Sequence, residues 1–65
     1  MPGILNVGDK FIIDTNVCED SDLIEWYSKQ TDKVLVAEHI ERDVNEVWVK
    51  NCPYRIDLDE IIKIK

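Results

Sequence analysis

Short stretches of apolar residues, several of them alternating with polar ones, run through most of this chain and predict a mainly β protein. The stretch KVLVAEHIE begins as an unbroken apolar run and ends in alternation, which indicates a strand buried on both faces at one end only. In EVWVKN, the alternation places Val47 and Val49 on one face and Trp48 on the other, wetter face. We expect strands over residues 10–15, 33–41, 46–51, 54–56 and 62–65.

Turn-forming residues separate these segments. Gly8-Asp9 is expected to form a turn before the first strand, because glycine allows a positive φ and aspartate can bond its own backbone. Residues 42–45 (RDVN) predict a tight antiparallel hairpin, and residues 51–53 interrupt the sheet because proline cannot donate to a ladder. Asp57 is expected to cap a single 3₁₀ turn, LDEI, with Glu60 at its third position.

The long connection over residues 16–32 changes to a helical pattern. Asp22 followed by Glu25 is a capping-box arrangement, in which a side chain accepts from the free N–H groups of a helix start. The apolar residues at positions i, i+3 and i+4 are Leu23, Trp26 and Tyr27. This spacing predicts one stripe of a helix of one to two turns inside the connection.

This order of elements resembles an SH3-like small β-barrel over residues 7–65. A Gly-Asp pair often opens the first strand of such barrels, and here it is Gly8-Asp9. The apolar residues around the last turn would be Ile56, Leu58 and Ile61. The resemblance implies one domain over residues 1–65: a mainly β, five-stranded SH3-like barrel with a short helix in the long first connection and a 3₁₀ turn before the last strand.

The resemblance is one of topology. The chain lacks the ALYDY-type segment and paired tryptophans of peptide-binding SH3 domains, and it lacks the basic surface and central glycine of KOW-type barrels. Binding residues of neither family are therefore carried over. An OB-like barrel is an alternative fold, and so is a ββα arrangement in which residues 57–65 form a longer C-terminal helix.

Composition limits the partners. Fourteen acidic residues against eight basic ones give a net charge of −6, whereas nucleic-acid binders and proteins of anionic membrane surfaces carry basic patches. We therefore expect no direct nucleic-acid binding and no membrane association. No basic segment followed by an apolar core opens the chain, so we expect a cytoplasmic protein with Cys18 and Cys52 reduced, although a bridge between them is left open.

Residue types suited to catalysis or metal binding are few. His39 is the only histidine, and the spacing does not place it beside Cys18 or Cys52 as a nucleophile would require. The closely spaced ligand pairs of zinc sites are absent from the sequence. We expect no enzyme activity, no cofactor and no metal, with His39 at the solvated end of a strand.

The aromatic and acidic residues favour a protein-binding role. Trp48, flanked by charges, is the residue type enriched at interaction hot spots, although it could instead be covered by the long connection. From Phe11 to Ser28 there is no basic residue, so these acids either cap a helix in solvent or meet a basic partner. The predicted partner-binding residues are Trp48, Trp26, Tyr27, Tyr54, Glu19, Asp20, Asp22 and Glu25.

We therefore expect a non-enzymatic, acidic interaction module that binds a protein, such as a basic host protein, with self-association left open. Nine isoleucines against one alanine are typical of an AT-rich genome, such as that of a low-GC bacterium or its phage. The alternative function is accordingly a phage or mobile-element inhibitor that blocks a host nucleic-acid or nucleotide enzyme by acidic mimicry. A metabolite-binding barrel is a third hypothesis, supported only by the aromatic residues.

Overall fold

The computed structural model describes residues 4–64, and this part of the chain is mainly β, with six short strands, one α-helix and two 3₁₀ turns. In chain order the elements are β1 (Lys10–Ile13), α1 (Ser21–Ser28), β2 (Leu35–Val36), β3 (His39–Glu41), η1 (Arg42–Val44), β4 (Glu46–Trp48), β5 (Ile56–Asp57), η2 (Leu58–Glu60) and β6 (Ile61–Ile64).

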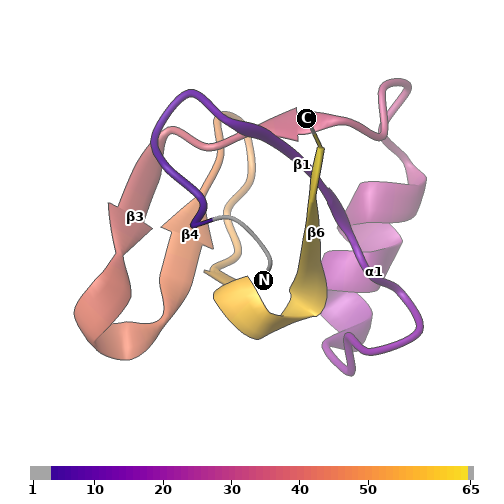
Figure 1. The fold of residues 1–65 in the computed structure, drawn as a ribbon. Helices are drawn as coiled ribbons and strands as arrows, with labels where there is room; N and C mark the ends of the chain where they lie inside the picture. Colours follow the sequence, from indigo (N-terminus) through magenta and orange to yellow (C-terminus); the bar gives the residue numbers. More distant parts are fainter. Residues whose placement is uncertain (1–3, 65) are drawn as a thin grey trace.

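The strands form two three-stranded antiparallel sheets, with the orders β2-β1-β6 and β3-β4-β5. In the first sheet, Phe11 of β1 pairs with Leu35 on one side and Lys63 on the other. In the second, Val47 of β4 pairs with Ile56 of β5. Figure 1 shows β3 and β4 on the left, β1 and β6 in the centre, and α1 on the right. Within residues 4–64 the strands make two sheets rather than one closed ladder, so the predicted five-stranded barrel is not confirmed.

The segment 33–41 is not the single long strand that we expected. It contains β2 in the first sheet and β3 in the second, with Ala37 and Glu38 between them. Ala37, which is 1% exposed, donates its N–H to the Asp9 carbonyl and accepts the N–H of Gly8. The chain passes from one sheet to the other at this point, and the only alanine of the sequence occupies the crossing, where little room is left for a side chain.

The N-cap of the helix lies two residues earlier than predicted. Asp20, and not Asp22, is the N-cap: its side chain accepts the N–H groups of Asp22 and Leu23. The capping-box pattern favours Asp22, which has Glu25 three positions on, whereas Asp20 has Leu23 there. Leu23 and Tyr27 are buried, as their helical spacing predicts, while Trp26 is half-buried.

Three strand boundaries differ from the expected ones. β1 ends at Ile13, because the Asp14 carbonyl turns to accept N–H groups from the next loop. β4 ends at Trp48, ahead of Asn51, whose φ of 67° breaks the extended chain. The predicted strand 54–56 is instead β5, at Ile56–Asp57. For β1 and β4 a turn begins closer to the strand than the apolar pattern suggests, whereas β5 begins two residues later and ends one residue later than expected.

The hairpin and the closing elements are confirmed. β3 and β4 are joined by η1 and Asn45, the four residues expected to form the turn. Asp57 caps η2 by accepting the N–H of Asp59 at 2.8 Å. β6 pairs with β1 over four residues, so the alternative helix over 57–65 is wrong within the described residues; Lys65, the last residue of the predicted strand, lies outside them.

The core lies between the two sheets and α1. Its largest side chains with less than 2% exposure are Phe11 and Val47 from the central strands, Leu23 from α1 and Ile56 from β5. Val49 is also buried, which confirms that Val47 and Val49 share the inner face of their segment.

Candidate functional site

Trp48 lies on the outward face of the β3-β4-β5 sheet. Its neighbour Val47 is fully buried, and Trp48 itself is half-buried and stands opposite the exposed His39. Residues directly opposite each other in an antiparallel pair share a face, so Trp48 and His39 lie on the same face of the sheet. Glu46 is two residues from Trp48 on β4 and therefore points outward with it. The prediction that Trp48 takes the wetter face is confirmed.

The other three predicted aromatic residues are tied more closely to the core. Tyr27 is 7% exposed, and its hydroxyl donates to the Lys33 carbonyl, with the Lys33 ammonium 5.2 Å from the ring centroid. Trp26 and Tyr54 are half-buried and pack against the core cluster, which Trp48 does not. Of the four aromatic residues, Tyr27 alone is buried, and Trp26, Trp48 and Tyr54 each keep part of their surface exposed.

The four predicted acidic residues divide into two groups. Asp22 and Glu25 are exposed on α1, where Glu25 forms an ion pair with Lys29 at 3.3 Å. Glu19 and Asp20 precede the helix, and Asp20 lies at the edge of a hollow. Only Asp20 of the predicted acids therefore contributes to the concave surface described next.

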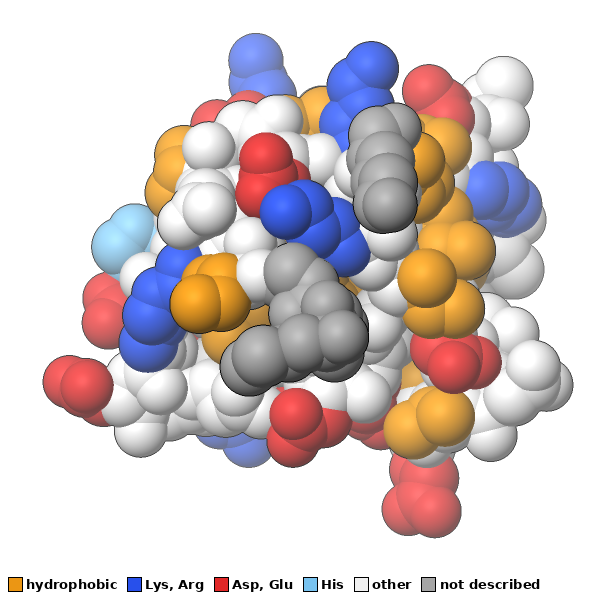
Figure 2. All heavy atoms as spheres, in the orientation of Figure 1, with side chains coloured by type: hydrophobic (Ala, Val, Ile, Leu, Met, Phe, Trp, Pro, Cys, Tyr) orange, Lys and Arg blue, Asp and Glu red, His pale blue; other side chains and the backbone are white. Residues whose placement is uncertain are grey.

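The hollow has a volume of about 580 Å³ and lies where the hairpin tip, η2 and the start of α1 meet. These three parts lie along the lower edge of the molecule in Figure 1, and acidic side chains predominate along the same edge in Figure 2. The lining residues are Asp20, Leu23, Val44, Glu46, Arg55, Asp57 and Glu60. Four carboxylates from four different elements thus surround two apolar side chains and a single guanidinium.

Backbone donors fix three of these carboxylates. Asp20 accepts two N–H groups as the cap of α1, and Asp57 accepts the N–H of Asp59 as the cap of η2. Glu60 accepts the N–H of Glu19 over 3.2 Å, across to the connection that precedes α1. Glu60 was expected to complete a capping box on its own turn and instead joins η2 to this connection. Carboxylates held in this way lose little side-chain freedom when they bind a cation.

Glu46 is a half-buried carboxylate of the hollow. Its side chain is 17% exposed and accepts from the guanidinium of Arg55 at 3.2 Å, while the Arg55 side chain is 75% exposed. A carboxylate partly removed from water interacts more strongly with a nearby cation than an exposed one does. Arg55 therefore neutralises Glu46 from the solvent side of the hollow.

The two thiols are free and buried. Burial raises the pKa of Cys18, and the neighbouring carboxylates of Glu60 and Asp20 raise it further. Burial likewise raises the pKa of Cys52. Both thiols are thus held in the protonated form near neutral pH, which makes them poor nucleophiles.

His39 is 60% exposed and lies 2.6 Å from the Glu41 carboxylate. It occupies the solvated end of β3, as the sequence predicted. Within residues 4–64, no group of three or more His, Cys, Asp or Glu side chains has the arrangement of a metal site.

Sequence reasoning missed Glu46, Arg55 and Val44 as parts of a site, and it interpreted Asp57 and Glu60 only as caps. One signal was present for Glu46, because the alternation in EVWVK places it on the same face as Trp48. For Arg55 and Val44 no local pattern exists, since their places depend on how the hairpin folds toward α1.

Comparisons of the chain with protein-family models, curated proteins and solved structures gave no match. Among the described residues, no helix has the length and apolar character needed to cross a membrane.

Proposed function

We propose that this chain is a non-enzymatic interaction module that binds a basic segment of a partner protein through the acidic hollow and Trp48. The observation that carries the proposal is the set of four carboxylates that converge on one hollow from α1, β4, β5 and η2. Charge complementarity of this kind raises association rates and selects partners. A role in binding rather than catalysis is also supported by the raised pKa of both thiols.

The partner segment we propose is an extended one that carries a lysine or arginine two residues away from an apolar residue, so that both lie on one face. Glu46 and Trp48 are two residues apart on one strand face, so their side chains start about 6.6 Å from each other. An extended partner segment has the same repeat. Its cation would meet Glu46 and the other carboxylates while its apolar residue covers Trp48.

The barrel assignment is also a proposal: we infer that the two sheets correspond to the two halves of an SH3-like small barrel. In support, β2 and β3 form a nearly continuous segment that contributes to both sheets, α1 lies in the long first connection, and η2 precedes the last strand. On this assignment the hollow lies between the long first connection and the β3-β4 hairpin.

The proposed function can be tested with an extended peptide of Arg-Ser-Val-Ser repeats, in which arginine and valine share one face, titrated into the ¹⁵N-labelled chain. We expect saturable amide shifts around Asp20, Glu46 and Asp57, with an affinity that falls as salt rises. The same peptide with glutamate in place of arginine is the negative control. Equal binding of both peptides, or shifts on other surfaces only, would overturn the proposal.

Matched variants sharpen this test. Glu46→Gln removes one carboxylate of the hollow and should weaken binding about tenfold, the loss of roughly one charge-assisted hydrogen bond. Glu38→Gln makes the same change at an exposed residue outside the hollow and should bind normally. Trp48→Ala should also weaken binding while leaving the fold intact, because Trp48 does not pack against the core cluster.

Acidic mimicry of a nucleic acid is the second proposal for the same carboxylates. Main-chain N–H groups hold the carboxylates of Asp20, Asp57 and Glu60 in place. The negative charges of the hollow are therefore at fixed positions, as the phosphates of a nucleic acid are. A mimic would bind the nucleic-acid cleft of a basic host protein, and duplex DNA would compete with it. Charge reversal at Asp20, Asp22 and Glu25 would then abolish binding, whereas a mainly apolar contact would depend on Trp48.

A further inference from the structure

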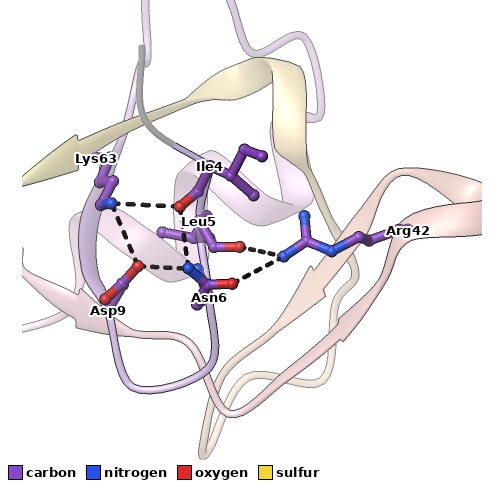
Figure 3. Close-up of polar contacts among 6 residues, drawn as sticks. All are labelled: Ile4, Leu5, Asn6, Asp9, Arg42 and Lys63. Atoms are coloured by element: carbon purple, nitrogen blue, oxygen red, sulfur yellow. Dashed lines mark hydrogen bonds and ion pairs between the residues drawn. The ribbon is translucent and has the colours of Figure 1, made fainter.

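The N-terminal segment Ile4–Asn6, here called the strap, crosses the seam between the two sheets. Figure 3 shows Lys63 on one side of the strap and Arg42 on the other. Lys63 belongs to β6 in the first sheet, and Arg42 belongs to η1, at the hairpin of the second. The strap thus touches both sheets without being a strand of either.

Side-chain cations hold the strap by its main chain. The Lys63 ammonium donates to the Ile4 carbonyl at 3.2 Å, and the Arg42 guanidinium donates to the Leu5 carbonyl at 2.6 Å. Within the described residues, the one main-chain to main-chain hydrogen bond of the strap is local, from the Asp9 N–H to the Asn6 carbonyl. The strap therefore carries no ladder that would fix it to a neighbouring strand.

One side chain of the strap enters the core. Leu5 is 6% exposed and belongs to the core cluster, whereas Ile4 is 65% exposed. Carbonyl groups are present in any segment, so the bonds of Lys63 and Arg42 to the main chain do not select a sequence. The buried position of Leu5 does, and so does the bond from Arg42 to the Asn6 side-chain oxygen at 3.3 Å. The seam therefore has the properties of a binding site for an extended Leu-Asn segment, filled here by the chain itself.

A tight turn returns the strap to the body of the protein. The Asp9 N–H bonds the Asn6 carbonyl at 2.9 Å, with Val7 and Gly8 at the two central positions. Gly8 has a φ of +92°, and a Cβ atom added there would have no heavy atom within 4 Å. The Gly8 N–H is itself bonded to the Ala37 carbonyl at 2.8 Å. The strap can therefore leave the body of the protein only if the turn opens at Val7 and Gly8, which changes the φ of Gly8 and breaks its bond to Ala37.

We propose that the strap is exchangeable: Ile4–Asn6 of one chain can occupy the seam of a second copy, and the reverse, giving a dimer. The contacts of Lys63 and Arg42 and the burial of Leu5 would form equally well in trans, because none of them lies within the turn that connects the strap to β1. The two hydrogen bonds between Asn6 and Asp9 close that turn and are lost when it opens. In the monomer this turn keeps the strap at an effective concentration on the order of millimolar. The monomer therefore predominates in dilute solution, and straining the turn favours exchange.

The proposal can be tested by measuring the molar mass of the Gly8→Val variant in solution, by light scattering across a concentration series. A β-branched residue at φ +92° strains the closed turn without any steric clash, so we expect the mass to double as concentration rises, while the unaltered chain stays monomeric in the same range. Asn51→Val is the matched control, since it strains a turn of similar φ away from the strap, and it should stay monomeric.

The double variant Leu5→Ala/Gly8→Val tests the buried position of Leu5 and should return to a monomer. Deletion of Val7 is a second way to open the turn, because a shortened hinge cannot close back on the same chain. A dimer that persists without Leu5, or a dimer of Asn51→Val, would overturn the proposal. So would a monomeric mass for both Gly8→Val and the Val7 deletion.

Discussion

Asn45 joins the β3-β4 hairpin to η2 through Asp57. Its side-chain amide donates to the Asp57 carboxylate at 2.8 Å, and its carbonyl accepts the Leu58 N–H at 3.0 Å. Asn45 is in the left-handed conformation, with φ 59°, and this conformation turns both groups toward η2. One residue therefore fixes the hairpin tip and one carboxylate of the hollow at the same time.

We expect Asn45→Ala to lower the free energy of unfolding by about 2 kcal/mol. Roughly half of this comes from placing alanine at a positive φ and half from the lost amide hydrogen bond. Asn51→Ala is the control, because Asn51 has a similar φ of 67°. It should cost only the backbone part, about 1 kcal/mol. Urea denaturation of the two variants measures the difference, and equal losses would contradict the role of the amide.

The position of the helix cap gives a second prediction. Asp20→Ala should destabilise the protein by about 1 kcal/mol, because two N–H groups of α1 lose their acceptor. Asp22→Ala removes only a favourable charge from the first turn and should cost a few tenths of a kcal/mol, on the order of 0.3. Denaturation followed by far-ultraviolet circular dichroism compares them. A larger loss for Asp22→Ala would mean that the helix begins where the sequence pattern suggested.

Core packing can be tested with two matched isoleucines. Ile56 is fully buried in β5, so Ile56→Val should cost about 0.5–1.5 kcal/mol through the cavity that it leaves. Ile62 is 48% exposed in β6, and Ile62→Val should be close to neutral. If thermal unfolding shows the same shift for both variants, the assignment of the two strand faces is wrong.

The Asp9 carboxylate makes stability dependent on pH in the acid range. The Asn6 N–H is the main cause of its lowered pKa, with a further contribution from Lys63. A carboxyl group whose pKa is lower in the folded state contributes stability above its ordinary pKa, and this contribution is lost as pH falls through the lowered value. Asp9→Asn should therefore show a weaker loss of stability in acid than the unaltered chain, as measured by urea midpoints at stepped pH.

Thiol reactivity tests the burial of both cysteines. Cys18 and Cys52 are 6% and 9% exposed, and their raised pKa values leave little thiolate near neutral pH. Iodoacetamide should therefore label the folded chain much more slowly than the urea-unfolded chain, with the modified residues identified by mass spectrometry. Prompt labelling of either thiol in the folded chain would contradict the structure.

The local elements could be predicted to the extent that they depend on neighbouring residues. The hairpin at residues 42–45, the cap at Asp57 and the burial of Val47 beside an outward Trp48 follow from turn chemistry and alternation. The choice of Asp20 over Asp22 as the helix cap did not follow, because only Asp22 has a glutamate three positions on and so fits the capping-box pattern. The path of the connection also depends on contacts between distant residues, such as that between Glu19 and Glu60.

The sequence by itself determined that this is a small acidic β-rich chain with a short helix and a capped turn before its last strand. Only the tertiary structure decided that residues 33–41 divide between two sheets at Ala37. It also brought Glu46, Asp57 and Glu60 together with Asp20 around one hollow. The reason is that alternation and capping act over a few residues, whereas the strand register and the crossing between sheets bring together residues more than forty positions apart in sequence.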